Sequence, residues 1–124
     1  MLTKQTAYEQ IRAYFTRPGA ELSRDEVDDF DGIAKCYYRH PDDNRACAIG
    51  CLVPDELYRA VWEGLSALAV MDYLPDLLAR EDEHFYQTAQ ALHDNADDVA
   101  HFLRRLDVLA ADHGLVVPAL TDAA

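Results

Sequence analysis

The stretch FYQTAQALHDNADDVAHFLRRLDVLA, residues 85–110, carries the clearest helical pattern in the chain and decides its fold class. Its apolar residues recur in steps of four and three, which places them on one face of a helix. These residues are Phe85, Ala89, Leu92, Ala96, Val99, Leu103, Leu106 and Ala110. The segment 94–98 in the middle is poor in helix formers and offers a cap for a second helix. The pattern therefore predicts either one helix over residues 82–112 or two helices in phase.

Further helices are predicted on the N-terminal side of this pattern. Apolar residues at helical spacing predict a first helix over residues 3–16, and the C-terminal helical face is expected to pack on it. A capping-box pattern predicts a short helix over residues 24–30. A proline followed by good helix formers predicts another helix over residues 54–64, and shorter helical pieces are expected after residue 66.

Two short β-prone runs, residues 33–39 and 46–50, flank a turn of sequence HPDDN. This order predicts a β-hairpin in which Arg39 faces Ala46. Arg39 and Arg45, on the two sides of the turn, are expected to pair with acids of the same chain.

Length and composition set the class of protein. The chain has 124 residues, of which 50% are hydrophobic, enough for one domain with its own core. We predict an α+β fold: a mostly helical single domain over residues 1–116 with a small two-stranded β-hairpin, followed by a frayed tail at 117–124.

The N-terminal residues lack the apolar run of a signal peptide, and the apolar stretches are too short to span a bilayer. These features predict a cytoplasmic protein without a membrane partner.

The three cysteines are an odd number, which in a reducing compartment predicts free thiols. On the predicted hairpin Cys36, Cys47 and Cys51 point to the same side, and Cys36 and Cys47 are diagonal neighbours about 7–8 Å apart. We interpret them as buried thiols without a metal or other cofactor. The alternative is a structural zinc held by these three thiolates and His93. That site needs a sharp turn at Gly50, because a continuous strand would hold Cys47 and Cys51 about 13 Å apart.

The formal net charge of −12 comes from 23 acidic and 11 basic residues. This balance argues against direct nucleic-acid binding, because a phosphate backbone is bound by basic residues. We predict instead an acidic face that binds a protein with a basic surface, for example a nucleic-acid-binding protein. The residues predicted for this face are Glu21, Asp25, Asp28, Asp29 and Asp31. An ordinary solvated surface is the alternative, and homodimerisation is left open.

His93 and Asp94 form an HD pair of the kind that a metal-dependent phosphohydrolase uses together with further ligands. Those further ligands cannot be placed from the sequence. The other interpretation is a boundary histidine hydrogen-bonded to the hairpin or a loop. Glycine-rich phosphate loops, GxSxG and HExxH motifs do not occur in the sequence. We therefore predict a non-catalytic binding protein, with a small hydrolase using His93 and Asp94 as the alternative.

Three parts of the sequence form a combination of motifs. Cys36, Tyr38 and Arg39 make a CxYR segment, residues 47–58 read CAIGCLVPDELY, and the HD pair follows in a later helix. In this combination the chain resembles small uncharacterised proteins of bacteria and bacteriophages. The resemblance carries no established activity. It implies a bacterial or phage origin and favours interaction with a host or regulatory protein, including antagonism of a basic host protein.

Overall fold

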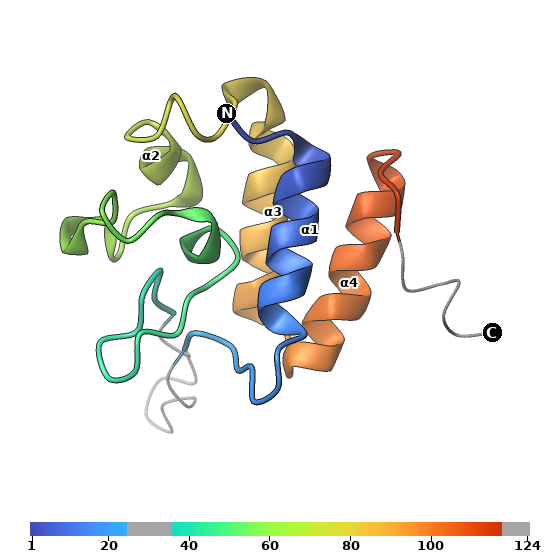
Figure 1. The fold of residues 1–124 in the computed structure, drawn as a ribbon, viewed down its shortest axis with the longest axis horizontal. Helices are drawn as coiled ribbons and strands as arrows, with labels where there is room; N and C mark the ends of the chain where they lie inside the picture. The colour runs from blue at the N-terminus through green and yellow to red at the C-terminus, as the bar shows by residue number, and fades with distance from the viewer. Residues whose placement is uncertain (25–35, 118–124) are drawn as a thin grey trace.

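The computed structural model describes residues 1–24 and 36–117, and this part of the chain is built from helices and loops (Figure 1). The helices in chain order are α1 (Lys4–Phe15), η1 (Gly50–Leu52), η2 (Ala60–Trp62), α2 (Ala67–Met71), η3 (Arg80–Asp82), α3 (Glu83–Asn95) and α4 (Val99–Asp112). The η elements are short 3-10 helices. Among the helices in these two ranges, none has the length and apolar character that crossing a membrane requires.

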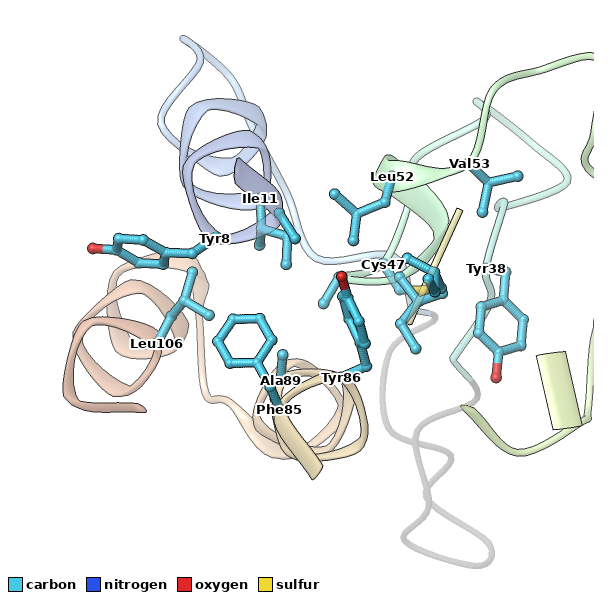
Figure 2. Packing of buried hydrophobic residues seen from close by; sticks show 14 of the residues in the cluster. Tyr8, Ile11, Tyr38, Cys47, Leu52, Val53, Phe85, Tyr86, Ala89 and Leu106 are labelled. Atoms are coloured by element: carbon cyan, nitrogen blue, oxygen red, sulfur yellow. The ribbon is translucent and has the colours of Figure 1, made fainter. Parts of the chain in front are cut away.

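The helices α1, α3 and α4 lie side by side and contain much of the core (Figure 1). α4 packs against both α1 and α3, which confirms the predicted contact between the C-terminal helical face and the first helix. Ile11 from α1, Phe85 and Ala89 from α3, and Leu106 from α4 meet between the helices (Figure 2) and are fully excluded from solvent. The first helix itself is confirmed within one residue at each end.

The C-terminal pattern forms two helices, which answers the question that its periodicity left open. α3 ends where Ala96 becomes extended, with φ −74° and ψ 147°. Asp98 then caps α4, because its side chain accepts a hydrogen bond of 2.7 Å from the backbone N–H of His101.

The predicted β-hairpin is wrong, and with it the α+β fold class. Arg39 and Ala46 do form an antiparallel bridge in the predicted register, but this bridge is isolated. The backbone of Cys36 forms a separate antiparallel bridge with that of Arg24 and does not continue the hairpin. The described residues contain isolated bridges and no sheet, so the fold is all-α.

The physical reason is that the chain coils after Ala46. The backbone N–H of Cys51 donates to the carbonyl oxygen of Cys47 at 2.9 Å, so these groups are used in a helical turn and not in a ladder. Gly50 allows this turn to lie against the preceding segment, because a Cβ atom there would clash with the carbonyl oxygen of Tyr38. The β-prone residues therefore form a compact loop.

The predicted helix over residues 54–64 is also wrong. After a single turn the chain becomes extended at Arg59, with φ −134° and ψ 131°, and only the short η2 follows. The carboxylate of Glu63 accepts hydrogen bonds from the backbone N–H groups of Tyr38 and Arg39 at 2.9 and 3.0 Å. These contacts hold the end of the segment against the 38–39 backbone and override its helix propensity.

The remaining expectations concern shorter segments. The helical pieces expected after residue 66 are α2 and η3. The predicted helix over residues 24–30 lies outside the described residues except for Arg24, and the predicted tail lies outside them except for Val117.

Candidate functional site

His93 is a buried residue of the core. Its ring lies between Phe15 and Phe102, with ring centroids 5.7 and 5.8 Å away, and is fully excluded from solvent. Its Nε2 accepts a hydrogen bond of 3.0 Å from the backbone N–H of Ser23, so the ring is neutral and its proton is on Nδ1. Nδ1 donates to Asp94 Oδ1 at 2.9 Å. His93 thus anchors a loop to α3, which confirms the predicted hydrogen bond to a loop, but the ring is fully buried and not at the boundary of the core.

Asp94 completes a polar network between α3 and the loops. Its Oδ1 also accepts a hydrogen bond of 2.9 Å from the side chain of Gln90, whose own oxygen accepts one of 3.1 Å from the backbone N–H of Ile49. Burial and the negative charge of Asp94 raise the pKa of Cys36 to about 12. Both ring nitrogens of His93 form internal hydrogen bonds, so His93 and Asp94 stabilise the contact between α3 and the loops. Neither ring nitrogen is left to bind a metal ion or a substrate.

The structure does not assemble the four residues of the alternative zinc site. Cys47 Sγ accepts a hydrogen bond from the backbone N–H of Gly50 at 3.2 Å, and Cys51 Sγ donates to the carbonyl oxygen of Ala48 at 3.1 Å. Throughout residues 1–24 and 36–117, no group of three or more Cys, His, Asp or Glu side chains is placed to hold a metal ion.

The three thiols are free, and Cys47 is buried while Cys36 and Cys51 are half-buried. Burial is the main cause that raises the pKa of each: to about 12 for Cys36 and Cys51, and well above its usual range for Cys47. A nucleophilic cysteine needs a thiolate, so none of the three is activated at neutral pH.

Arg39 pairs with an acid of the same chain, as predicted. Its Nη1 lies 2.6 Å from Asp55 Oδ1. Its Nε and Nη2 donate to the carbonyl oxygens of Gly50 and Val53 at 3.3 and 2.6 Å. Arg39 therefore ties together η1 and the segment that follows it.

Arg45 makes the second predicted pair. Its Nε lies 2.9 Å from Asp43 Oδ1, and its Nη1 lies 3.4 Å from Glu21 Oε2. Glu21 is thus placed next to a cation of its own chain, although its side chain is 68% exposed. The other residues predicted for the acidic face lie outside the described residues: Asp25, Asp28, Asp29 and Asp31.

An apolar hollow of about 560 Å³, here called the aromatic hollow, lies between η2 and the turn that follows α2. Val61 and Trp62 line one side, and Tyr73 and Pro75 line the other. The Trp62 and Tyr73 rings stack with centroids 6.0 Å apart and planes inclined by 28°. Trp62 is buried, but Val61 is 75% and Tyr73 is 61% exposed, so large apolar groups face the solvent around the hollow.

Sequence reasoning missed the aromatic hollow because it assigned Val61 and Trp62 to a helix. The available signal was composition, because residues 57–77 are rich in large apolar side chains. Which of these side chains remain exposed depends on the chain path after Arg59, and that path is set by contacts distant in sequence.

Comparisons of the chain with models of protein families, with curated proteins and with solved structures found no match.

Proposed function

We propose that this chain is a non-catalytic protein-binding module that docks on its partner through the aromatic hollow. The supporting observation is the exposure of Val61 and Tyr73 beside the buried Trp62. Clustered apolar exposure of this kind is typical of interaction sites, and Trp, Tyr and Arg dominate the binding energy of protein interfaces. Arg59 adds the third of these residue types to the lining.

The proposed partner is a protein that presents an apolar side chain on a basic surface. A net charge of −12 steers basic proteins toward the chain. Asp76 lines the hollow, and Glu56 directly precedes the lining residue Leu57. Both acids are exposed, and neither is ion-paired within the described residues. The Arg59 guanidinium donates to the backbone carbonyl oxygens of residues 56 and 58, so Asp76 is left to pair with a cation of the partner.

The acidic residues predicted from the sequence fit this proposal as a steering surface. Glu21, Asp25, Asp28, Asp29 and Asp31 would raise the rate of encounter with a basic protein, while the aromatic hollow supplies the short-range contact. We place the chain in the cytoplasm of a bacterium or a phage-infected cell, where its three free thiols would stay reduced. Direct nucleic-acid binding is not part of the proposal.

The test is a comparison of two serine substitutions at exposed valines. Val61→Ser changes the aromatic hollow, whereas Val108→Ser changes an exposed valine on α4, which is 60% exposed. Each tagged protein, together with a Tyr73→Ser variant, is used for affinity purification from bacterial lysate at low and high salt, followed by mass spectrometry. The expected result is a basic protein that the wild type and Val108→Ser retain and that both hollow variants lose.

Two outcomes would contradict the proposal. The first is equal retention of every partner by the wild type and the hollow variants, which would make the hollow irrelevant to binding. The second is a purified chain that dimerises in sedimentation equilibrium and becomes monomeric on Val61→Ser, which would make the hollow a contact between two copies of this chain.

A further inference from the structure

A polar hollow of about 610 Å³, here called the arginine cleft, opens beyond the C-terminal end of α1. Its other walls are the turn before Ala46, η1 and the segment after it. Three of the eleven basic residues of this acidic chain line it: Arg17, Arg39 and Arg45. Asp43 and Asp55 line it too, so the lining has three positive and two negative side chains. This excess of positive charge contrasts with the net charge of the whole chain. The arginine cleft shares no lining residue with the aromatic hollow.

Arg17 is a cation of the cleft whose two Nη groups have no hydrogen-bond partner among the described residues. Its guanidinium lies over the ring of Tyr14, 3.9 Å from the centroid, and its Nε donates to the Tyr14 carbonyl oxygen at 2.8 Å. In the part of the chain that the structure describes, no carboxylate is ion-paired with Arg17. The two Nη groups of a guanidinium carry four N–H donors, and those of Arg17 remain for a ligand.

Arg39 is held in position with one replaceable partner. Its side chain is only 11% exposed, and its bonds to the carbonyl oxygens of Gly50 and Val53 fix the guanidinium. Its guanidinium also lies 5.6 Å from the centroid of the Tyr58 ring, and its ion-pair partner, Asp55, is 86% exposed. Because the Asp55 side chain is open to solvent, another anion can compete with it for the Arg39 Nη1 group.

Arg17, Arg39 and Cys51 line the same cleft, and both guanidinium charges act on the Cys51 thiol. Burial raises the pKa of this thiol to about 12, and the positive charges of Arg39 and then Arg17 act on it in the opposite direction. Tyr14 supplies a further polar group: its hydroxyl accepts a hydrogen bond of 2.8 Å from the backbone N–H of Ala46 and keeps its own hydrogen to donate.

We propose that the arginine cleft binds an oxyanion, a phosphate or carboxylate group of a small molecule, through Arg17 and Arg39. The paired N–H donors of a guanidinium match two oxygens of either group, and the resulting charge-assisted hydrogen bonds are stronger than neutral ones. The Tyr14 hydroxyl donates to the same group. Arg45 remains bound to Asp43 and to the carbonyl oxygen of Leu22 and forms the wall of the cleft.

The experiment measures the binding of inorganic phosphate and of acetate by NMR titration of the backbone amides, at constant ionic strength kept with NaCl. Arg17→Gln removes the free cation, and Arg104→Gln makes the same charge change on the exposed surface of α4. Arg17→Gln is expected to weaken binding about tenfold, the effect of one lost charge-assisted contact, and Arg104→Gln to leave it unchanged.

A second pair of variants tests Arg39 without removing it. Asp55→Asn frees Arg39 from its competing carboxylate and is expected to strengthen oxyanion binding, whereas Asp112→Asn, at an exposed position at the end of α4, is expected to leave it unchanged. Circular dichroism of each variant checks that the fold is retained.

The comparison of phosphate with acetate shows whether the ligand of the arginine cleft carries a phosphate or a carboxylate group. Saturable binding of phosphate alone assigns a phosphate-bearing ligand, binding of acetate alone assigns a carboxylate-bearing one, and binding of both supports the shared chemistry. Absence of saturable binding to either anion overturns the proposal. An equal effect of Arg17→Gln and Arg104→Gln also overturns it, because binding would then follow the overall charge.

Discussion

Tyr86 is a fully buried tyrosine whose hydroxyl has no hydrogen-bond partner among the described residues. Its side chain points from α3 toward η1 (Figure 2). A buried hydroxyl without a partner loses its hydration and gains nothing in return. Tyr8, which is equally buried, is the opposite case, because its hydroxyl donates to Asp107 Oδ1 at 2.6 Å.

The same substitution should therefore have opposite effects at these two tyrosines. Tyr86→Phe is expected to raise the free energy of unfolding by about 1 kcal/mol, because it removes an unsatisfied polar group. Tyr8→Phe is expected to lower it by about 1.5 kcal/mol, because it removes a hydrogen bond to a charged group. Urea denaturation monitored by circular dichroism measures both. A loss of stability in Tyr86→Phe comparable to that in Tyr8→Phe would show that the Tyr86 hydroxyl has a partner after all.

Among the elements, α4 depends on a cap at its N-terminus. Asp98→Ala removes the side chain that accepts from the backbone N–H of His101 and is expected to cost about 1 kcal/mol of stability. Asp97→Ala makes the same charge change at the preceding exposed residue and is expected to cost much less, since its side chain does not cap the helix. Chemical denaturation compares the two variants, and equal losses would contradict a capping role for Asp98.

Elements whose pattern is local could be predicted from the sequence. The periodicity of residues 85–110 and of the first helix identified the three main helices, because a helix buries one stripe of its own side chains. The predictions of the β-hairpin and of the helix over residues 54–64 were wrong for the same reason. The path of each segment is fixed by groups far away in the sequence, at Gly50 against Tyr38 in one case and at Glu63 against the 38–39 backbone in the other.

The same distinction applies to the candidate sites. The pairing of Arg39 and Arg45 with acids and the loop contact of His93 were predictable, because buried or half-buried charged and polar groups require partners. The aromatic hollow and the arginine cleft were not. Each is lined by segments from different parts of the chain, and residue spacing contains no information on which segments meet in space.

For the molecule as a whole, a cluster of one lysine and two histidines joins the ends of three helices. His113 Nε2 lies 3.4 Å from Nδ1 of His84 at the start of α3, and His113 Nδ1 lies 3.4 Å from Nζ of Lys4 at the start of α1. Burial, then the charges of Lys4 and of His84, lower the pKa of His113 below its ordinary value of 6.5, while Asp112 and Asp82 act in the opposite direction.

This cluster predicts how stability depends on pH. Because the pKa of His113 is lower in the folded than in the unfolded chain, the unfolded chain binds a proton more readily, and stability falls as the pH drops below about 6.5. The loss of stability caused by His113 ends once the pH is below the pKa of His113 in the folded chain. Urea denaturation between pH 8 and pH 5 should show a smaller loss for His113→Gln than for the wild type. Identical losses in both proteins would contradict this origin.

The contacts of α1 with α4 and with the segment after α4 join residues that are 95 to 111 positions apart in the sequence. The Tyr8 hydroxyl and the Arg12 guanidinium both reach Asp107, and the side chain of Gln5 bonds in both directions with the backbone of Val116. On the ribosome, α1 leaves the exit tunnel long before α4 has been made. At a synthesis rate of roughly 5–20 residues per second, several seconds pass between the synthesis of α1 and that of α4, and during this time the apolar face of α1 cannot pack against α4. During this interval the nascent chain offers an unpaired amphipathic helix to chaperones and proteases, and the three-helix core closes only after α4 has emerged.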